Sequence, residues 1–212
     1  MNFLSPQTSE YLNSLVPPRP AEMQKMEARA ARDGFPIIGP ACGQICYQIA
    51  RMIGARRVYE LGSGFGYSTA WFAMAVQENG GGEVHHTVWD ETLSTQAKEH
   101  LAAMGLDEIV HYTVGEAVAA FKVTEGPFDI IFCDIDKEGY PNAVDLAYEK
   151  LRTGGVLLFD NMLWSGKILD ESDQSAATQG IRETTGMLAS SDKWITSVLP
   201  IRDGLSVSVK VK

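Results

Sequence analysis

From Arg57 onward, short apolar runs alternate with stretches of helical periodicity, and this alternation limits the possible folds more than any other feature of the sequence. A strand, a helix and a further strand, repeated about five times, are typical of a mostly parallel sheet covered by helices on both faces. The runs that predict strands are residues 58–61, 84–89, 109–114, 128–133, 156–159, 196–199 and 205–211. The helices predicted between them are residues 68–77, 92–104, 117–121, 141–151 and 176–190. The chain is therefore expected to form a Rossmann-like, doubly wound α/β sheet of seven strands.

The two ends of the chain depart from this alternation. Residues 201–204 alone separate the last two apolar runs, so these runs are expected to form an antiparallel hairpin at one edge of the sheet. The first part of the chain favours three helices, at residues 9–16, 21–33 and 41–53, because prolines and Gly54 mark their boundaries. Since no repeat or long linker interrupts the sequence, we expect one domain over 1–212, with N-terminal helices in 1–54 and the sheet in 55–212.

Charge and composition narrow the classes of partner. The net charge of -9 gives no general attraction for phosphate backbones, so nucleic acid is not the expected partner. A chain with this net charge can still carry a local basic patch. No apolar run is long enough to span a membrane, and residues 1–15 lack a basic segment followed by an apolar one. We therefore expect a cytoplasmic protein with no membrane partner. The three cysteines form no CxxC pair and indicate neither a disulfide framework nor a zinc site.

A glycine-rich turn follows the first predicted strand, where ligands bind in doubly wound sheets. Its spacing, Gly62-x-Gly64-x-Gly66, is one residue shorter than the dinucleotide pattern, and Glu60 precedes it. A carboxylate there would repel a pyrophosphate, which disfavours a nicotinamide oxidoreductase. Asp90, at the end of the second strand, is placed to accept hydrogen bonds from ribose hydroxyls. Together these features favour an adenosine ligand without a pyrophosphate, and S-adenosylmethionine fits that description.

Oxygen ligands follow the fourth and fifth predicted strands. Asp134 ends one strand, and Asp160 and Asn161 end the next. Neighbouring parallel strands would bring these side chains to one rim, where two carboxylates without a cation would repel each other. Two carboxylates and an amide oxygen suit Mg²⁺, Mn²⁺ or Ca²⁺. The pattern therefore predicts a divalent cation site.

The glycine turn, the strand-end acids and the segments around them, in this order, resemble those of one enzyme family. The chain is similar from about Ile38 to Val209 to the cation-dependent class I O-methyltransferases, which include the caffeoyl-CoA and catechol O-methyltransferases and small bacterial relatives. The resemblance implies metal ligation by Asp134, Asp160 and Asn161, and Lys137 matches the lysine proposed to deprotonate the acceptor hydroxyl. It also implies a homodimer. The cofactor-binding residues that it implies are Ile38, Glu60, Gly62, Ser63, Ser68, Asp90, Ala117, Asp134 and Asp136.

One departure concerns the entry to the helix before the first strand. Relatives commonly carry two acidic residues there, whereas this chain has Ala41 and Cys42, which leaves the identity of the acceptor open. Trp164 is a candidate aromatic wall for a flat acceptor, although packing under its loop is nearly as good an interpretation. Tyr140 either stacks on the acceptor in the same way or only starts its helix.

The resulting hypothesis is methyl transfer from S-adenosylmethionine to a hydroxyl of a small, catechol-like aromatic compound, assisted by a divalent cation and by Lys137 as the general base. Two alternatives stay open at this point. One is a tRNA hydroxyuridine O-methyltransferase of the same fold, which the acidic charge disfavours. The other is a binding protein that retains S-adenosylmethionine without turnover, which the presence of Lys137, Asp134, Asp160 and Asn161 disfavours.

Overall fold

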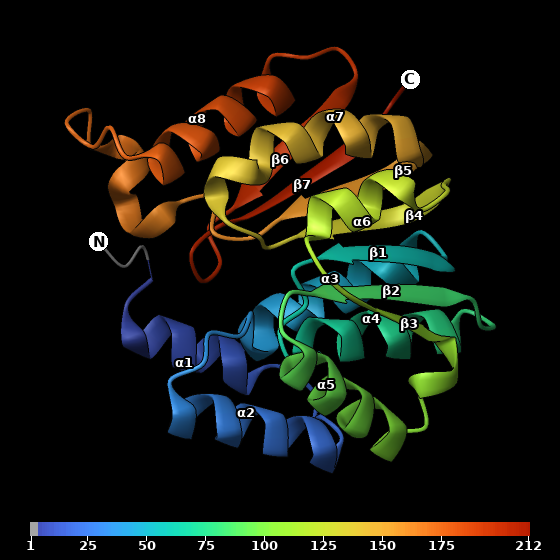
Figure 1. Cartoon of the computed structure of the whole chain (residues 1–212). Helices are drawn as coiled ribbons and strands as arrows, with labels where there is room; N and C mark the ends of the chain where they lie inside the picture. The colour runs from blue at the N-terminus through green and yellow to red at the C-terminus, as the bar shows by residue number, and fades with distance from the viewer. Residues whose placement is uncertain (1–3) are drawn as a thin grey trace.

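The computed structural model describes residues 4–212, and its strands form one mixed sheet in the order β3-β2-β1-β4-β5-β7-β6 (Figure 1). β1 to β5 are parallel, and β7 runs antiparallel to both of its neighbours, β5 and β6. This arrangement confirms the seven-stranded α/β sheet and its antiparallel edge hairpin. Residues 1–3, the start of the predicted N-terminal helical part, lie outside the described residues. The strands are β1 (Arg57–Leu61), β2 (Glu83–Val88), β3 (Val110–Val114), β4 (Phe128–Cys133), β5 (Leu151–Phe159), β6 (Trp194–Leu199) and β7 (Leu205–Lys210).

The strand order reverses beside β1, and this reversal locates the ligand crevice. β2 and β3 extend the sheet to one side of β1, whereas β4 and β5 extend it to the other. Chain connections therefore leave β1 and β4 toward opposite faces, which opens a crevice at the carboxyl ends of these two strands. Val58 pairs with both Val84 and Ile130, so the carboxyl ends of β1, β2 and β4 lie at the same edge.

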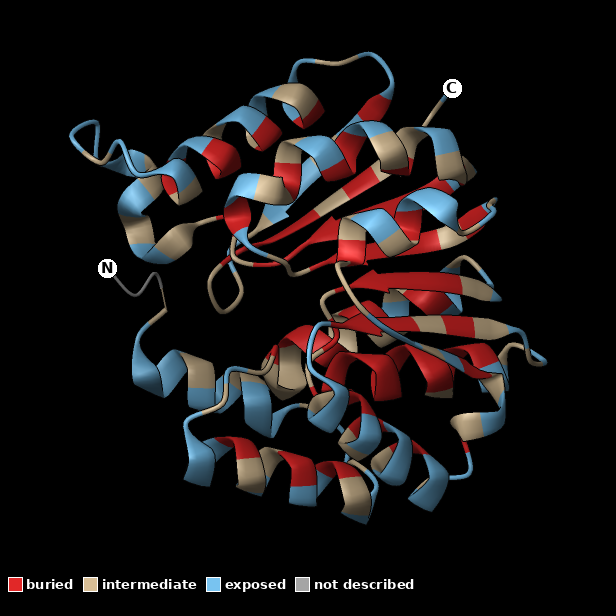
Figure 2. Cartoon of the chain, in the orientation of Figure 1, coloured by how far each residue is buried: buried red, intermediate tan, exposed pale blue. Residues whose placement is uncertain are grey.

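Two helical layers cover the sheet. One face carries α3 (Gly39–Met52), α4 (Tyr67–Glu78) and α5 (Glu91–Ala103), and the other carries α6 (Ala117–Val123), α7 (Tyr140–Lys150) and α8 (Ala176–Ala189) (Figure 1). Each layer encloses its own apolar core, and the central strands are buried from both sides (Figure 2). This two-sided burial explains the nearly continuous apolar runs in the sequence.

The N-terminal helices α1 (Pro6–Ser14) and α2 (Ala21–Asp33) precede α3 and bring residues 35–38 to the mouth of the crevice. α2 buries Met23, Met26 and Ala30. Glu27 of α2 accepts hydrogen bonds from Tyr67 of α4 at 2.8 Å and from Arg19 at 2.7 Å. These contacts fix the position of α2 against the sheet domain.

Some boundaries differ from those predicted. α1 starts three residues before the predicted start, because the Ser5 side chain caps the amide of Thr8 and Pro6 occupies the first turn. β5 starts at Leu151, which was predicted to end the preceding helix. The first residues of β5 include Arg152, Thr153 and two glycines, so only its later half shows the continuous apolar pattern, and the register between β4 and β5 shifts between Phe128 and Ile130.

Three short 3-10 helices complete the description: η1 (Asp107–Ile109), η2 (Lys137–Gly139) and η3 (Trp164–Leu169). Within residues 4–212, every helix is too short or too polar to cross a membrane.

Two helical glycines give a matched test of the packing between α3 and α4. A Cβ atom at Gly43 would lie 2.1 Å from the indole nitrogen of the buried Trp71, whereas a Cβ at Gly186 in α8 would meet nothing within 4 Å. We expect Gly43→Ala to lower the free energy of unfolding by about 1–3 kcal/mol, because the indole must be displaced. Gly186→Ala should raise it by up to about 1 kcal/mol through helix propensity. Urea denaturation of both variants checks this, and equal effects would contradict the packing.

Candidate functional site

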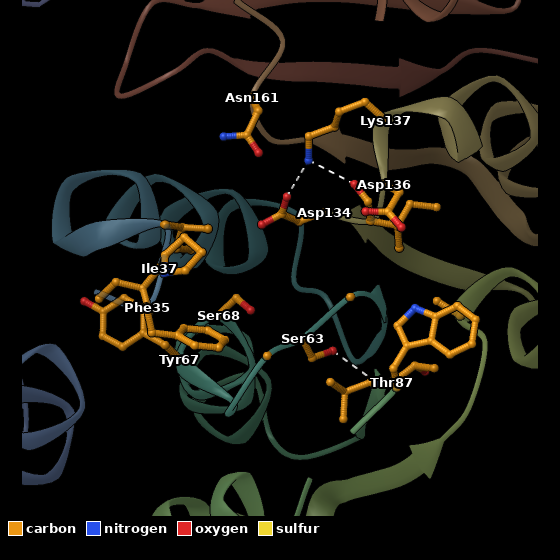
Figure 3. Close-up of a pocket in the computed structure, with 18 of the residues that line it drawn as sticks. Phe35, Ile37, Ser63, Tyr67, Ser68, Thr87, Asp134, Asp136, Lys137 and Asn161 are labelled. Carbon is orange, nitrogen blue, oxygen red and sulfur yellow. Dashed lines mark hydrogen bonds and ion pairs between the residues drawn. The ribbon is translucent and has the colours of Figure 1, made fainter. Parts of the chain in front are cut away.

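A cavity of about 640 Å³ opens at the carboxyl ends of β1, β2, β4 and β5 (Figure 3). Asn161, Lys137 and Asp134 lie on one side of it, and Ser63, Ser68 and Tyr67 lie on the other. Ten of the predicted site residues line this cavity: Ile38, Gly62, Ser63, Ser68, Ala117, Asp134, Asp136, Lys137, Asn161 and Trp164. Residues far apart in the sequence thus meet where the strand order reverses.

The glycine turn after β1 forms the floor of the cavity. Gly62 has a φ of 84°, and a Cβ atom there would lie 2.3 Å from the backbone carbonyl oxygen of Asp134. Only glycine therefore fits where this turn touches the segment that follows β4. The amide of Ser63 donates to the Thr87 carbonyl, and the Ser63 hydroxyl accepts from the Thr87 amide, both at 3.1 Å. The turn is fixed to β2 as well as to β4.

Glu60 lies behind the glycine turn and is fully buried. One carboxylate oxygen accepts a 2.5 Å hydrogen bond from the Thr69 hydroxyl, and the other has no hydrogen-bond partner among residues 4–212. Burial raises the pKa of Glu60 to about 7, because an ionised carboxylate loses its hydration there. Glu60 does not line the cavity, so its predicted contact with the cofactor stays a prediction.

Asp90 follows β2 at an exposed position and caps α5. Its carboxylate accepts hydrogen bonds from the amides of Thr92 at 2.6 Å and Leu93 at 3.1 Å. These bonds hold the pKa of Asp90 below its usual value. The neighbouring Trp89 lines the cavity, whereas Asp90 does not. Its role toward ribose hydroxyls therefore also stays a prediction.

Lys137 is a buried cation on the cavity wall, with 7% of its surface exposed. Its ammonium donates to Asp134 Oδ1 at 2.8 Å and to the Ile135 carbonyl at 3.0 Å. The ring centroids of Tyr140 and Trp164 lie 4.8 and 5.8 Å from the ammonium. These four groups hold the nitrogen in one place at the cavity wall.

Helix α8 supports Lys137 from behind. A Cβ atom at Gly180 would lie 2.2 Å from the Lys137 carbonyl oxygen. The absence of a side chain at position 180 therefore lets the helix approach the backbone of η2 closely. The position of Lys137 along the cavity wall depends on this contact.

Asp160 and Asn161 follow β5 and face different surroundings. Asp160 is fully buried, and its Oδ2 accepts a 2.6 Å hydrogen bond from the Arg202 guanidinium. Its Oδ1 is buried without a hydrogen-bond partner in the described part of the chain. Burial raises the pKa of Asp160 to about 6, although the charge of Arg202 opposes this shift. Asn161 lines the cavity and has a φ of 60°, in the left-handed region that asparagine tolerates better than most residues.

The two aromatic candidates have different positions. Trp164 lines the cavity next to Lys137, which fits an aromatic wall. Tyr140 is fully buried, starts α7 and donates a 2.9 Å hydrogen bond to the Asp160 carbonyl, so it supports the Asp160 backbone from below. Since Tyr140 is absent from the cavity wall, stacking of the acceptor on Tyr140 has no support here.

Sequence reasoning missed two parts of the site. Phe35, Pro36 and Ile37 line the mouth of the cavity, and only the placement of α2 brings them there. Arg202 also lines the cavity and reaches Asp160 from the connection between β6 and β7. The signal for Arg202 was its presence in the turn of the predicted hairpin.

Comparison with known proteins shows which family and which solved structures this chain is similar to. A family model described as O-methyltransferase matches residues 17–211. A catechol O-methyltransferase from Niastella koreensis is 31% identical over 190 residues, which cover 84% of this chain and 85% of that protein. Caffeoyl-CoA O-methyltransferase 2 from Zea mays is 25% identical, with 94% of this chain and 80% of that protein covered.

Solved structures have the same fold. The O-methyltransferase TomG from Streptomyces achromogenes, solved in complex with SAM, gives a TM-score of 0.87 at 24% identity and covers 97% of this chain and 96% of that one. The cofactor-bound protein Rv0187 from MTB gives a TM-score of 0.86 at 26% identity with the same coverage.

The raised pKa of Glu60 predicts a pH-dependent stability. The buried acid favours the folded state while it is protonated, and this contribution is lost as pH rises from the ordinary pKa of 4.5 toward the folded value of about 7. Glu60→Gln removes that loss. From about pH 5.5 to about pH 8, the free energy of unfolding of the ligand-free variant should gain about 2 kcal/mol relative to wild type. Urea titrations measure this, and a pH-independent difference would contradict it.

Proposed function

The chain belongs to the O-methyltransferase family, and on this premise we propose that it transfers the methyl group of S-adenosylmethionine to a hydroxyl of a small catechol-like compound, aided by a divalent cation. One observation carries the proposal. A glycine cradle, a buried lysine held by an aspartate, and an asparagine that follows a buried aspartate converge on one cavity. The cradle fits a nucleoside ligand, and the opposite wall fits an ionising hydroxyl.

The cofactor assignment rests on the cradle and on the nature of the cavity walls. Gly62 and Ser63 present backbone at the floor, Ser68 offers a hydroxyl, and Ala117 and Ile38 supply small apolar surfaces. TomG and Rv0187, whose structures contain SAM and a cofactor respectively, share this fold. When bound, S-adenosylmethionine supplies the methyl group as an electrophile.

The cation assignment rests on the chemistry of the oxygen donors. Asp134 and Asn161 line the cavity, and Asp160 keeps a buried oxygen atom without a partner in residues 4–212. Two carboxylates and an amide oxygen are a donor set suited to Mg²⁺ or Mn²⁺, so these residues fit the group. When bound, the cation supplies a Lewis acid that lowers the pKa of an acceptor hydroxyl.

Lys137 is the proposed general base. Hydrogen bonds to Asp134 and to the Ile135 carbonyl orient its nitrogen, and the residue lines the cavity. In the deprotonated state, Nζ takes the proton of the acceptor hydroxyl. Trp164, beside Lys137, provides a flat face for an aromatic acceptor. Alignment of the acceptor with the methyl donor would supply much of the rate enhancement.

The acceptor class follows from the cavity and the relatives together. The cavity of about 640 Å³ is of a size that holds small ligands. The relative from Niastella koreensis is named for catechol, and the Zea mays relative for caffeoyl-CoA. A vicinal dihydroxy aromatic offers two adjacent oxygens toward the proposed cation site, so we place the acceptor in that chemical class.

A methyl-transfer assay with paired acceptors tests this function. With S-adenosylmethionine and Mg²⁺, a catechol should be methylated faster than the matching monohydroxy compound, because only the catechol presents two oxygens. Removal of divalent cations with EDTA should abolish transfer, and added Mg²⁺ or Mn²⁺ should restore it. Full activity after exhaustive chelation would contradict the metal part of the proposal. Absence of transfer to every catechol, with transfer to hydroxylated tRNA, would replace the acceptor class.

Substitutions of Lys137 separate a base from a structural cation. Lys137→Ala should lower kcat by about 10²–10⁴, because the proton acceptor is lost. Lys137→Arg should fail similarly, since a guanidinium keeps its proton at accessible pH. Binding of S-adenosylhomocysteine, measured by calorimetry, should be nearly unchanged in both variants. Near-normal kcat in the arginine variant would show that Lys137 contributes only its positive charge.

A further inference from the structure

Arg202 has no part in the function proposed above, yet its guanidinium pairs with a proposed metal ligand. We propose that Arg202 is a built-in counter-ion that competes with the divalent cation for Asp160, and so sets the affinity of the site for the metal. The inference rests on the proposed function, because it takes Asp160 as a ligand. It concerns the regulation of that site by a residue of the hairpin turn.

The contact between the two side chains is short and buried on the aspartate side. Arg202 Nη1 lies 2.6 Å from Asp160 Oδ2, and the Asp160 side chain has no exposed surface. A buried carboxylate is strongly destabilising without a positive partner. The guanidinium provides this charge compensation for Asp160, and a divalent cation would provide it as well. Both positive charges cannot remain beside one carboxylate at low cost. Asp160 Oδ1 is free to face a cation while Oδ2 holds the guanidinium, but the charge of Arg202 opposes a second positive charge there. The cation therefore binds most tightly to molecules in which the guanidinium has withdrawn.

The guanidinium has a place to withdraw to. The Arg202 side chain is 30% exposed and lines the main cavity. It also lines an adjoining cavity of about 220 Å³, together with Leu12, Ile38 and Cys42. A rotation of the side chain toward this second cavity would free Asp160 Oδ2 without movement of the backbone.

The backbone holds Arg202 in register with the ligand loop. The amides of Met162 and Leu163 donate to the carbonyls of Gly204 and Asp203 at 2.9 and 2.8 Å, so the hairpin turn is attached directly after Asn161. Arg202 itself has a φ of 52°, a region that an arginine adopts only when its surroundings impose it. This fixed turn delivers the guanidinium to Asp160 whenever the cation is absent.

Competition has a measurable consequence. The apparent dissociation constant of the cation equals the intrinsic constant divided by the fraction of molecules in which Asp160 is free of the guanidinium, so occupancy of about nine-tenths or more weakens binding at least about 10-fold. Removal of the guanidinium should then tighten cation binding by at least about 10-fold. Backbone strain at Arg202 could also affect cation binding, and two substitutions distinguish this effect from the effect of the guanidinium charge. Arg202→Met keeps the stem and the backbone requirement but removes the charge, whereas Arg202→Gly also relieves the positive φ.

Mn²⁺ is the probe, and its binding to the full chain is measured by electron paramagnetic resonance without any acceptor. Both Arg202→Met and Arg202→Gly should bind Mn²⁺ at least about 10-fold more tightly than wild type. Asp160→Asn gives the background of weak surface sites. Arg152→Met is the matched control, because Arg152 forms an equally short 2.6 Å pair with Asp129 at the opposite end of the strands, and its Mn²⁺ affinity should equal that of wild type.

Each outcome decides the inference. Tighter binding in both Arg202 variants, with the Arg152 control unchanged, supports competition. Equal affinity in wild type and both Arg202 variants overturns it, and chelator-sensitive methyl transfer would still leave the proposed function standing. Failure of every variant to bind Mn²⁺ above the Asp160→Asn background overturns this inference together with the metal part of the proposed function.

Discussion

The contact between the turn after β1 and the segment after β4 is the constraint on which the site depends. The Asp134 amide donates to the Leu61 carbonyl at 2.8 Å, and the Asp134 carbonyl occupies the space that a side chain at Gly62 would need. The glycine turn proposed to hold the nucleoside and the segment that carries Lys137 are therefore parts of one hydrogen-bonded structure. Because both belong to parallel strands buried on both faces, the apolar core fixes the distance between the two halves of the site.

Two buried carboxylates lie at this edge of the sheet, and neither is fully satisfied. Glu60 and Asp160 each keep one oxygen without a hydrogen-bond partner in the described residues, and burial raises the pKa of both. A chain selected for stability alone would replace such groups by apolar ones. Both carboxylates lie close to the cavity, and Arg202 supplies a positive charge to Asp160 in this structure. Carboxylates with such shifted pKa values are frequent at functional sites, which is consistent with the proposed function.

Much of this arrangement could be predicted because it follows from strand ends. Asp134, Asp160 and Asn161 were predicted to share one rim, since parallel strands bring their last residues to the same edge, and Asp134 and Asn161 do line the cavity while Asp160 is buried behind it. The hairpin was also predicted from the short connection at 201–204. The position of β7 directly beside β5 was not predicted. The contact of Arg202 with Asp160 was therefore missed, because only the full strand order brings the two residues together. The directions in which the Glu60 and Asp90 side chains point could not be predicted from the sequence either. They depend on local hydrogen bonds, from Thr69 to the buried Glu60 and from the Thr92 amide to Asp90, which caps α5.

The close approach of Gly180 to the Lys137 carbonyl has a consequence for how such an enzyme can change over time. Position 180 is not part of the cavity wall and belongs to helix α8, yet its lack of a side chain lets α8 approach the Lys137 backbone. Acceptor preference can change through substitutions in the cavity wall, whereas the backbone of the proposed base, Lys137, is positioned by a residue without a side chain. A mutant library limited to the residues of the cavity wall would therefore vary acceptor selectivity, but it would not vary Gly180, which determines how closely α8 packs against Lys137.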